Sequence, residues 1–146
     1  MKTHKFSTQG GPLRKKSFRM ANRTVKLYQY LIEEKKEYIM SKQLLKAGTN
    51  PGAMVRESEN AESDKDFIHK LSVAQKETGE TQFWLELLYQ NDYLTRSEFE
   101  SIYSDTTEVM RLLRSSIMTK KQKLGLLSIS IFAILGTLGY VYLANS

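Results

Sequence analysis

The chain lacks cysteine altogether, and its 146 residues include only two histidines and two prolines. The missing cysteine excludes disulfides, thiolate metal sites and a cysteine nucleophile, so redox chemistry says nothing about the compartment. His4 lies in the N-terminal leader, and helical spacing places His69 on an exposed face. One carboxylate-x-x-His element, Asp66 to His69, is too little for a di-iron bundle site or a Ser-His-Asp arrangement. We therefore expect no enzymatic activity, no metal and no cofactor.

The sequence also lacks the signatures of a signal peptide and of a phosphate-binding loop. Residues 1–12 contain no apolar run of the kind that a signal peptide needs, and we expect a disordered leader there. The segment from Gly48 to Gly52 has two glycines, but it has neither the lysine nor the preceding strand of a P-loop. Function must therefore be sought in surface charge, apolar surface and assembly.

Charges of opposite sign are concentrated in different parts of the chain. Residues 1–36 hold ten basic and two acidic side chains, residues 37–110 hold seven and fourteen, and residues 111–123 hold five and none. The formal net charge of +6 therefore conceals a basic beginning, an acidic middle and a second basic segment.

Residues 124–144 form a run of 21 residues without a charge, LGLLSISIFAILGTLGYVYLA. A helix of this length measures about 31 Å, which matches the roughly 30 Å hydrocarbon core of a bilayer. Three lysines at residues 120–123 precede the run, so the positive-inside rule predicts a cytoplasmic N-terminal side. We expect a single-pass C-terminal membrane anchor. The alternative, a buried helix of a soluble cytoplasmic bundle, would normally show one polar face, which this run lacks.

Apolar residues at three- and four-residue steps predict four amphipathic helices before this run. The first covers residues 13–32, and its predicted core face consists of Phe18, Ala21, Val25, Tyr28 and Ile32. The second covers residues 35–60, and its predicted core face consists of Met40, Leu44, Ala47, Pro51 and Val55. Gly48 and Gly52 allow another helix to approach closely, and Pro51 should kink the second helix or tighten it locally.

The third and fourth helices have the clearest boundaries. Ser63 and Asp66 form a capping pair at the start of the third helix, and Asn91-Asp92 end it. Thr95 and Glu98 form a capping box at the start of the fourth helix. The expected core seam of the third helix is Phe67, Leu71, Ala74, Thr78, Thr81, Leu85 and Leu88. The expected core face of the fourth is Phe99, Ile102, Thr106, Val109, Leu113 and Ile117.

Four helices with short connections predict an all-α fold, an antiparallel up-down-up-down four-helix bundle with a C-terminal transmembrane helix. The expected organisation is a leader at 1–12, the bundle at 13–119, a basic collar at 120–123 and the transmembrane helix at 124–144. If the fourth helix continues through Lys120, one helix serves both bundle packing and membrane anchoring.

Four sequence runs spread over all four helices carry a family resemblance. They are KSFRMANRTVKLYQYL (16–31), SKQLLKAGTNPGAMVRESENAES (41–63), DFIHKLSVAQKETGETQFWLELL (66–88) and YLTRSEFESI (93–102). Over residues 14–119 the chain resembles the bacterial 23S rRNA-intervening sequence proteins, to which accessory proteins of diversity-generating retroelements are similar. The resemblance implies a ring-like homopentamer, a basic surface and no known enzymatic activity. Met54, where members usually carry a small polar residue, and the apolar run depart from the family pattern.

A basic stripe on the first helix is the candidate nucleic-acid-binding site. Its residues are Arg14, Lys15, Lys16, Arg19, Arg23 and Lys26, with Lys2 and Lys5 nearby, and RNA or DNA phosphates are the expected ligands. A solvated helix face that keeps the protein soluble is one alternative. Contact of these cations with anionic lipid head groups beside a membrane is another.

A second set, Arg56, Glu57, Glu77, Thr81 and Trp84, is assigned to structure or assembly. Thr78 and Thr81 place hydroxyls in the core seam, where they bond to carbonyls of their own helix or to neighbours. Arg56 and Glu57 are expected to pair with Glu77 or Glu80, across the bundle or across a subunit interface, and Trp84 supplies a large buried ring.

The resulting hypothesis is a non-enzymatic, self-assembling accessory protein on the cytoplasmic face of the cell membrane, which binds nucleic acid through a basic surface. The alternative is a membrane-anchored adaptor between proteins whose basic face contacts lipid.

Overall fold

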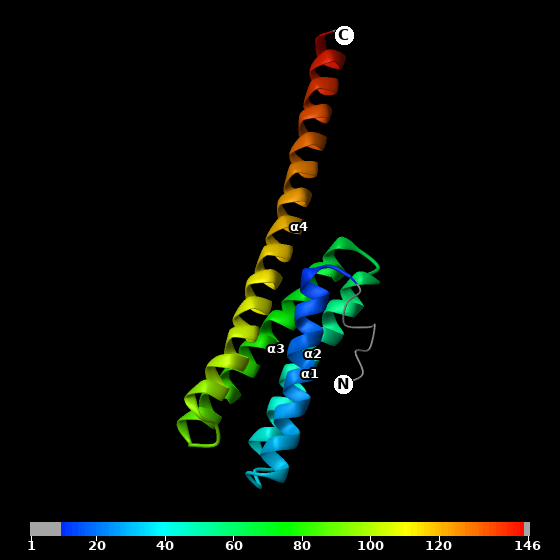
Figure 1. The fold of residues 1–146 in the computed structure, drawn as a ribbon. Helices are drawn as coiled ribbons and strands as arrows, with labels where there is room; N and C mark the ends of the chain where they lie inside the picture. Colours follow the sequence, from blue (N-terminus) through cyan, green and yellow to red (C-terminus); the bar gives the residue numbers. More distant parts are fainter. Residues whose placement is uncertain (1–9, 145–146) are drawn as a thin grey trace.

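The computed structural model describes residues 10–144, except the side chain of Leu127. This part of the chain is helical and contains no strand: α1 (Pro12–Glu33), α2 (Met40–Glu59), α3 (Asp64–Gln90) and α4 (Arg96–Ala144). Short connections join the helices, and α4 runs on far beyond the other three (Figure 1). Predictions that concern Lys2, His4 and Lys5 lie outside the described residues.

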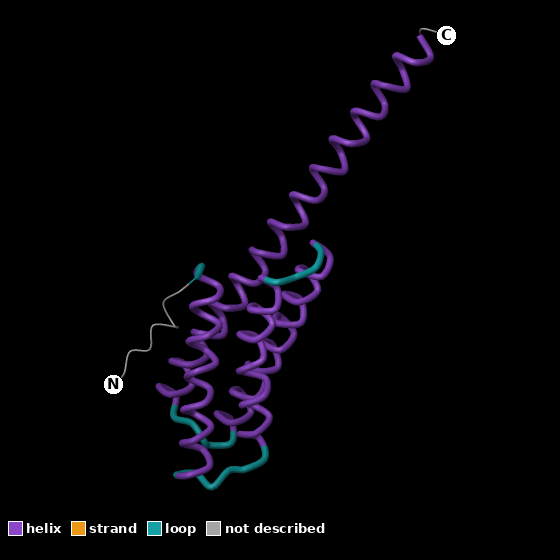
Figure 2. Tube along the Cα trace, turned by 90° about the vertical axis from the view of Figure 1, so that its right-hand side faces the viewer, coloured by secondary structure: helices purple, strands orange, loops and turns teal. Residues whose placement is uncertain are grey.

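The four helices pack as a ring of neighbours. α2 packs against α1 and α3, α4 packs against α3 and α1, and the backbones of the two diagonal pairs do not come close to each other among the described residues. The view in Figure 2 shows the same four-helix body from the side, with the last part of α4 leaving it as a single helix. The all-α four-helix fold is therefore confirmed.

Capping residues set the starts of α3 and α4 where the sequence predicts them, and α1 begins one residue before the predicted Leu13. Pro12 occupies the first turn of α1, where its missing N–H costs nothing. The Asp66 N–H donates to Ser63 Oγ at 3.0 Å at the start of α3. At the start of α4, the Glu98 N–H donates to Thr95 Oγ1 at 3.2 Å and the Thr95 N–H donates to Glu98 Oε2 at 2.8 Å. This reciprocal pair is the predicted capping box.

The start of α2 differs from the prediction by five residues. The predicted helix begins at Lys35, whereas α2 begins at Met40, because Lys36 has a left-handed φ of 53°. Glu37 then folds back, and its carboxylate accepts hydrogen bonds from the N–H groups of Ile39, Met40 and Ser41 at 3.0, 2.9 and 2.6 Å. Burial alone would raise the pKa of Glu37, but these bonds, together with one to the Ser41 side chain, hold its pKa below the usual value.

The core consists of two apolar clusters separated by a layer of threonines. One cluster contains Met20, Val55, Leu71, Ala74, Val109, Leu113 and Ile117. The other contains Leu31, Leu44, Leu85, Leu88, Leu94 and Ile102. Along α1, α3 and α4, fully buried threonines lie between the residues of the two clusters; they are Thr24, Thr78, Thr81 and Thr106. Thr24, Thr78 and Thr81 each donate to the carbonyl four residues earlier at 2.8 Å, so the buried hydroxyls are hydrogen-bonded.

The core faces of α2, α3 and α4 follow the predicted pattern, but the predicted face of α1 is wrong. The buried residues of α1 are Ser17, Met20, Thr24 and Leu31, whereas the predicted set of Phe18, Ala21, Val25, Tyr28 and Ile32 is only half-buried. The cause is a close approach to α2. A Cβ atom at Gly48 would lie 2.5 Å from Thr24 Oγ1, and one at Gly52 would lie 3.3 Å from the Ser17 carbonyl oxygen. Small side chains therefore face α2, and the larger apolar ones flank this contact.

Candidate functional site

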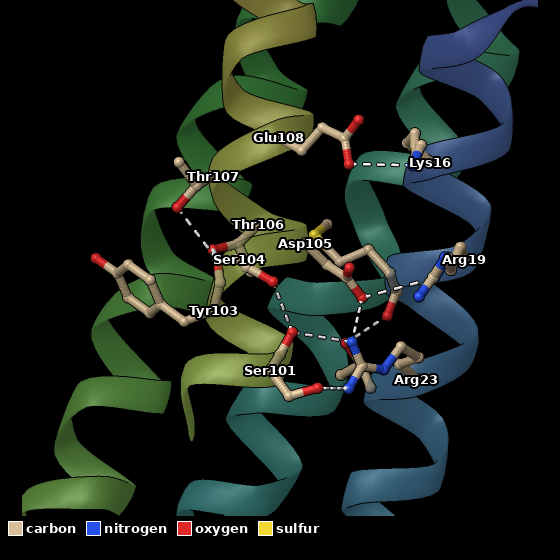
Figure 3. A network of polar contacts seen from close by, with 12 residues as sticks. Lys16, Arg19, Arg23, Ser101, Tyr103, Ser104, Asp105, Thr106, Thr107 and Glu108 are labelled. Atoms are coloured by element: carbon tan, nitrogen blue, oxygen red, sulfur yellow. Dashed lines mark hydrogen bonds and ion pairs between the residues drawn. The ribbon is translucent and has the colours of Figure 1, made fainter. Parts of the chain in front are cut away.

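Half of the basic stripe of α1 lies against α4, namely Lys16, Arg19 and Arg23 (Figure 3). Lys16 Nζ is 3.1 Å from Glu108 Oε2. Asp105 Oδ2 is 2.5 Å from Arg23 Nη1 and 3.9 Å from Arg19 Nε. Three of the six predicted nucleic-acid-binding residues thus form ion pairs along the seam between α1 and α4.

Arg23 makes the most contacts in this seam. Its guanidinium donates to Asp105, to the Ser101 carbonyl oxygen at 3.0 Å and to Ser101 Oγ at 2.7 Å. The side chain of Asp105 is only 14% exposed, so its charge is partly shielded from solvent and interacts more strongly with the two arginines. Arg23 is therefore bound at both terminal nitrogens to α4.

The remaining stripe residues differ from one another. Arg14 Nη1 is 2.6 Å from Glu59 Oε2 on α2, which removes a fourth cation from the free set. Lys15 and Lys26 are exposed, and neither forms an ion pair with a described residue. Nucleic-acid binding by this stripe stays a prediction, and Lys15 and Lys26 are the residues most available for it.

The acidic partners of the stripe were not assigned a role from the sequence. Ser101, Asp105 and Glu108 recur at four- and three-residue steps on α4, and Lys16, Arg19 and Arg23 recur at three- and four-residue steps on α1. Such matched spacings on two helices are a signal for an ion-paired seam. The spacing of the cations on α1 alone does not reveal this seam.

The assembly residues lie on α2 and α3 and contact different partners from those expected. The Arg56 guanidinium carbon lies 5.4 Å from the centroid of the Phe18 ring. Glu57 Oε2 is 2.8 Å from Lys70 Nζ, and this hydrogen bond raises the pKa of Lys70 above its usual value. Pairing of Arg56 or Glu57 with Glu77 or Glu80 within the chain is therefore wrong, because cation-π contact and Lys70 occupy these two side chains. Pairing across a subunit interface stays a prediction.

Aromatic side chains on α3 and α4 form a partly open surface. Trp84 is half-buried rather than fully buried, and its Nε1 donates to Glu80 Oε1 at 3.2 Å. Phe83, which is 52% exposed, lies edge-on to Trp84 with ring centroids 5.0 Å apart. Tyr103 donates to Glu86 Oε1 at 2.8 Å, and this bond raises the pKa of Tyr103. Exposed aromatic rings of this kind are typical of interface hot spots.

Residues 10–144 contain no group of three or more His, Cys, Asp or Glu side chains that could hold a metal ion. His69 is exposed on α3, as its helical position predicts. Asp66 is used at the helix start, where its carboxylate accepts the Glu62 N–H at 3.3 Å.

The apolar run continues α4 without a break from Arg96 to Ala144. By length and composition α4 can cross a membrane, and none of its most apolar 18-residue window is buried against the rest of the chain. Ser128 and Ser130 donate to the carbonyl oxygens of Leu124 and Leu126 at 3.0 Å, so these hydroxyls are bonded within the helix. The alternative of a helix buried in the bundle is wrong for the described residues.

Fold and surface together define a helical-bundle protein with an ion-paired seam between α1 and α4 and an added apolar helix. Residues 12–115 match the 23S rRNA-intervening sequence proteins, and the chain belongs to this family. A solved structure of a protein of unknown function from the S23 ribosomal protein family of Bacteroides thetaiotaomicron is 50% identical, with a TM-score of 0.71. The match covers 97% of that chain but 72% of this one. No curated protein matches the chain.

Proposed function

We propose that this chain is a non-enzymatic, membrane-anchored scaffold of the 23S rRNA-intervening sequence protein family. In this proposal an antiparallel up-down-up-down bundle at the cytoplasmic face is held by residues 124–144 in the membrane. The bundle offers its outer surface to other proteins or to further copies of itself. The family assignment covers the bundle, and the proposed anchor lies beyond the matched residues.

The observation that carries the proposal is the uncharged run of 21 residues in α4, whose most apolar 18-residue window is not buried against the rest of the described chain. Large apolar side chains such as Phe132 and Leu138, which are 78% and 61% exposed, face outward along it. Exposing so much contiguous apolar surface to water is costly, at about 25 cal/mol for each Å². A bilayer removes that cost, because the backbone of the helix is already hydrogen-bonded internally.

Self-assembly into a homopentamer is the second part of the proposal. The exposed Phe83 and half-buried Trp84 on α3 support it, because aromatic side chains with one open face are suited to a subunit contact. The mass of the full chain in a mild detergent, measured by native mass spectrometry, tests it. We expect five copies, and a monomer in all detergents would remove this part.

Alkaline carbonate extraction of cells that express the full chain tests the anchor. We expect the chain to stay in the membrane pellet. The variant Ile131→Lys/Leu135→Lys should move to the supernatant, because a lysine near the bilayer centre costs about 3 kcal/mol. The matched control Asn22→Lys/Gln29→Lys adds the same charge at exposed positions of α1 and should remain in the pellet.

Release of the unmodified chain by carbonate would contradict the anchor. So would identical behaviour of the charged variant and the control. Retention of both double-lysine variants after carbonate would show that something other than residues 124–144 holds the protein.

Binding of RNA or DNA is a second candidate function, favoured by the net charge of +6 and by Lys15 and Lys26, which are exposed and form no ion pair with a described residue. It is less well supported, since the other four stripe cations already have carboxylate partners. Binding of the detergent-solubilised chain to duplex DNA, single-stranded DNA and RNA across a salt series tests it. Phosphate contacts require affinity that falls as salt rises, and no binding near physiological salt would remove this candidate.

A further inference from the structure

The cations near the start of the apolar run differ in whether they form ion pairs with residues of the bundle. Lys120 Nζ forms an ion pair with Asp64 at the start of α3 and lies 5.1 Å from the centroid of the Phe67 ring. Arg114, Lys121 and Lys123 are exposed and form no ion pair with any described residue. The basic collar therefore contains one structural lysine and two lysines whose charge is available.

Lys121 faces an open groove rather than a neighbouring carboxylate. The groove has a volume of about 550 Å³, and its six lining residues are Gln75 of α3 and Arg114, Ile117, Met118, Lys121 and Gln122 of α4. Two of these six side chains are cationic and none is acidic. A cation pair of this kind attracts an anionic group, because no internal acid competes for it.

The height of each cation along α4 determines what it can reach. At about 1.5 Å per residue, Lys123 and Lys121 lie about 1.5 and 4.5 Å before Leu124, where the uncharged run begins. The polar layer of each bilayer leaflet is about 5 to 7 Å thick, so both lysines fall within it. Arg114 lies about 15 Å before Leu124 and acts only through a longer-range field, over a Debye length of about 8 Å.

We propose that Lys121 and Lys123 bind the phosphate of anionic phospholipids, and that Arg114 strengthens the attraction at a distance. This inference rests on the proposed membrane anchor and names the lipid class that the anchor prefers. Asp105, Glu108 and Glu59 already pair with four of the six cations of the α1 stripe, so we assign lipid binding to the collar.

Lipid titration of the full chain in mild detergent, followed by native mass spectrometry, tests the inference with phosphatidylglycerol and phosphatidylcholine as probes. We expect tighter binding of phosphatidylglycerol. One lysine near an anionic surface changes affinity by about fivefold, so Lys121→Gln/Lys123→Gln should weaken phosphatidylglycerol binding by roughly 30-fold. Lys42→Gln/Lys46→Gln is the control, because it removes the same charge from exposed positions of α2.

A gain of binding provides an independent test that no loss of folding can imitate. Asp64→Asn should release Lys120 from its ion pair and add one available cation at the same height. Phosphatidylglycerol binding should then strengthen by about fivefold. Arg114→Gln should weaken binding less than either collar lysine does, and its effect should disappear first as salt is raised.

The inference fails if phosphatidylglycerol and phosphatidylcholine bind equally, or if the α2 control loses as much binding as the collar variant. Competition by inorganic phosphate at equal potency would identify a free-anion site and would also overturn it. Carbonate extraction separates these failures from failure of the anchor. The collar variant should stay in the membrane pellet, because apolar residues 124–144 hold it there, whereas release of the unmodified chain would refute the anchor itself.

Discussion

Gly48→Ala should destabilise the bundle, although alanine is the better helix former. A Cβ atom at this position would lie 2.5 Å from Oγ1, 2.6 Å from Cγ2 and 3.0 Å from Cβ of Thr24. Thr24 cannot turn away freely, since it is fully buried and its hydroxyl donates to the Met20 carbonyl oxygen at 2.8 Å. Overpacking costs about 1 to 3 kcal/mol, and the helix propensity of alanine returns about 0.5 to 1 kcal/mol. The expected net loss in the free energy of unfolding is therefore at most about 2.5 kcal/mol, and about 1 kcal/mol at the middle of these ranges.

Gly79→Ala is the matched control, because Gly79 also lies inside a helix. A Cβ atom there would meet only the terminal carbon of Met110, at 3.9 Å, which is ordinary contact. This variant should gain about 0.5 to 1 kcal/mol from helix propensity alone. Urea unfolding of the full chain in mild detergent, followed by far-ultraviolet circular dichroism, measures both changes.

The difference in stability between Gly48→Ala and Gly79→Ala tests the contact between α1 and α2. If Gly48→Ala gains as much stability as Gly79→Ala, the two helices are not in the close contact described. A Thr24→Ala background should relieve part of the cost of Gly48→Ala, because it removes the two nearest atoms. Strict additivity of the two substitutions would refute the contact, since touching residues are coupled.

Three further predictions concern polar contacts. Asp105→Asn should cost about 1 to 3 kcal/mol, because it leaves the partly buried guanidinium of Arg23 without its carboxylate partner. Glu100→Gln in the exposed helical pair with Arg96 should cost less than about 0.5 kcal/mol, and urea unfolding compares the two variants. Thr95→Ala should cost about 1 kcal/mol by the same assay, through loss of the hydrogen bond to the Glu98 N–H. Glu37→Gln should cost about 1 to 3 kcal/mol at neutral pH, and a pH series of unfolding curves measures how this cost changes.

The pH dependence of the Glu37 contribution has a defined sign. The folded state lowers the pKa of Glu37 from its ordinary value of 4.5, so the stabilisation is fully present above that value and is lost as pH falls through the folded pKa. The gap between the unmodified chain and Glu37→Gln should therefore shrink in acid. A constant gap would show that the carboxylate charge plays no part. Equal losses of stability in Asp105→Asn and Glu100→Gln would contradict the described contacts of Asp105. An unchanged free energy of unfolding in Thr95→Ala would contradict the capping bond.

Local sequence signals predicted those elements whose ends are fixed by neighbouring residues. The capping box of Thr95 with Glu98 placed the start of α4, and the seven-residue repeat of α3 placed six of its seven seam residues in the core. The start of α2 was missed because Glu37 caps the helix from two or more residues away, at a position where glutamate normally favours helix. A left-handed Lys36 is equally invisible to periodicity.

The face of α1 was missed because packing, and not hydrophobicity, selects it. Contact with Gly48 and Gly52 requires small residues, so Ser17 and Thr24 are buried in place of Phe18 and Val25. The same rotation explains the basic stripe. Because Met20 and Leu31 face the core, Lys16 and Arg23 face α4, where they pair with Glu108 and Asp105. This pairing can be predicted only when the spacing of the cations on α1 is compared with the spacing of the carboxylates on α4.

Because α4 is one unbroken helix, the orientation of the bundle around the helix axis is fixed relative to the side chains of the apolar segment. Each residue turns an α-helix by about 100° and advances it by about 1.5 Å. One residue inserted near the collar would therefore swing the whole bundle by about 100° around the axis of the apolar segment, and seven inserted residues would nearly restore its direction. The number of residues between the bundle and the apolar run 124–144 thus sets the direction in which every surface of the bundle faces around the helix axis. This includes the surface of α3 that carries Phe83 and Trp84.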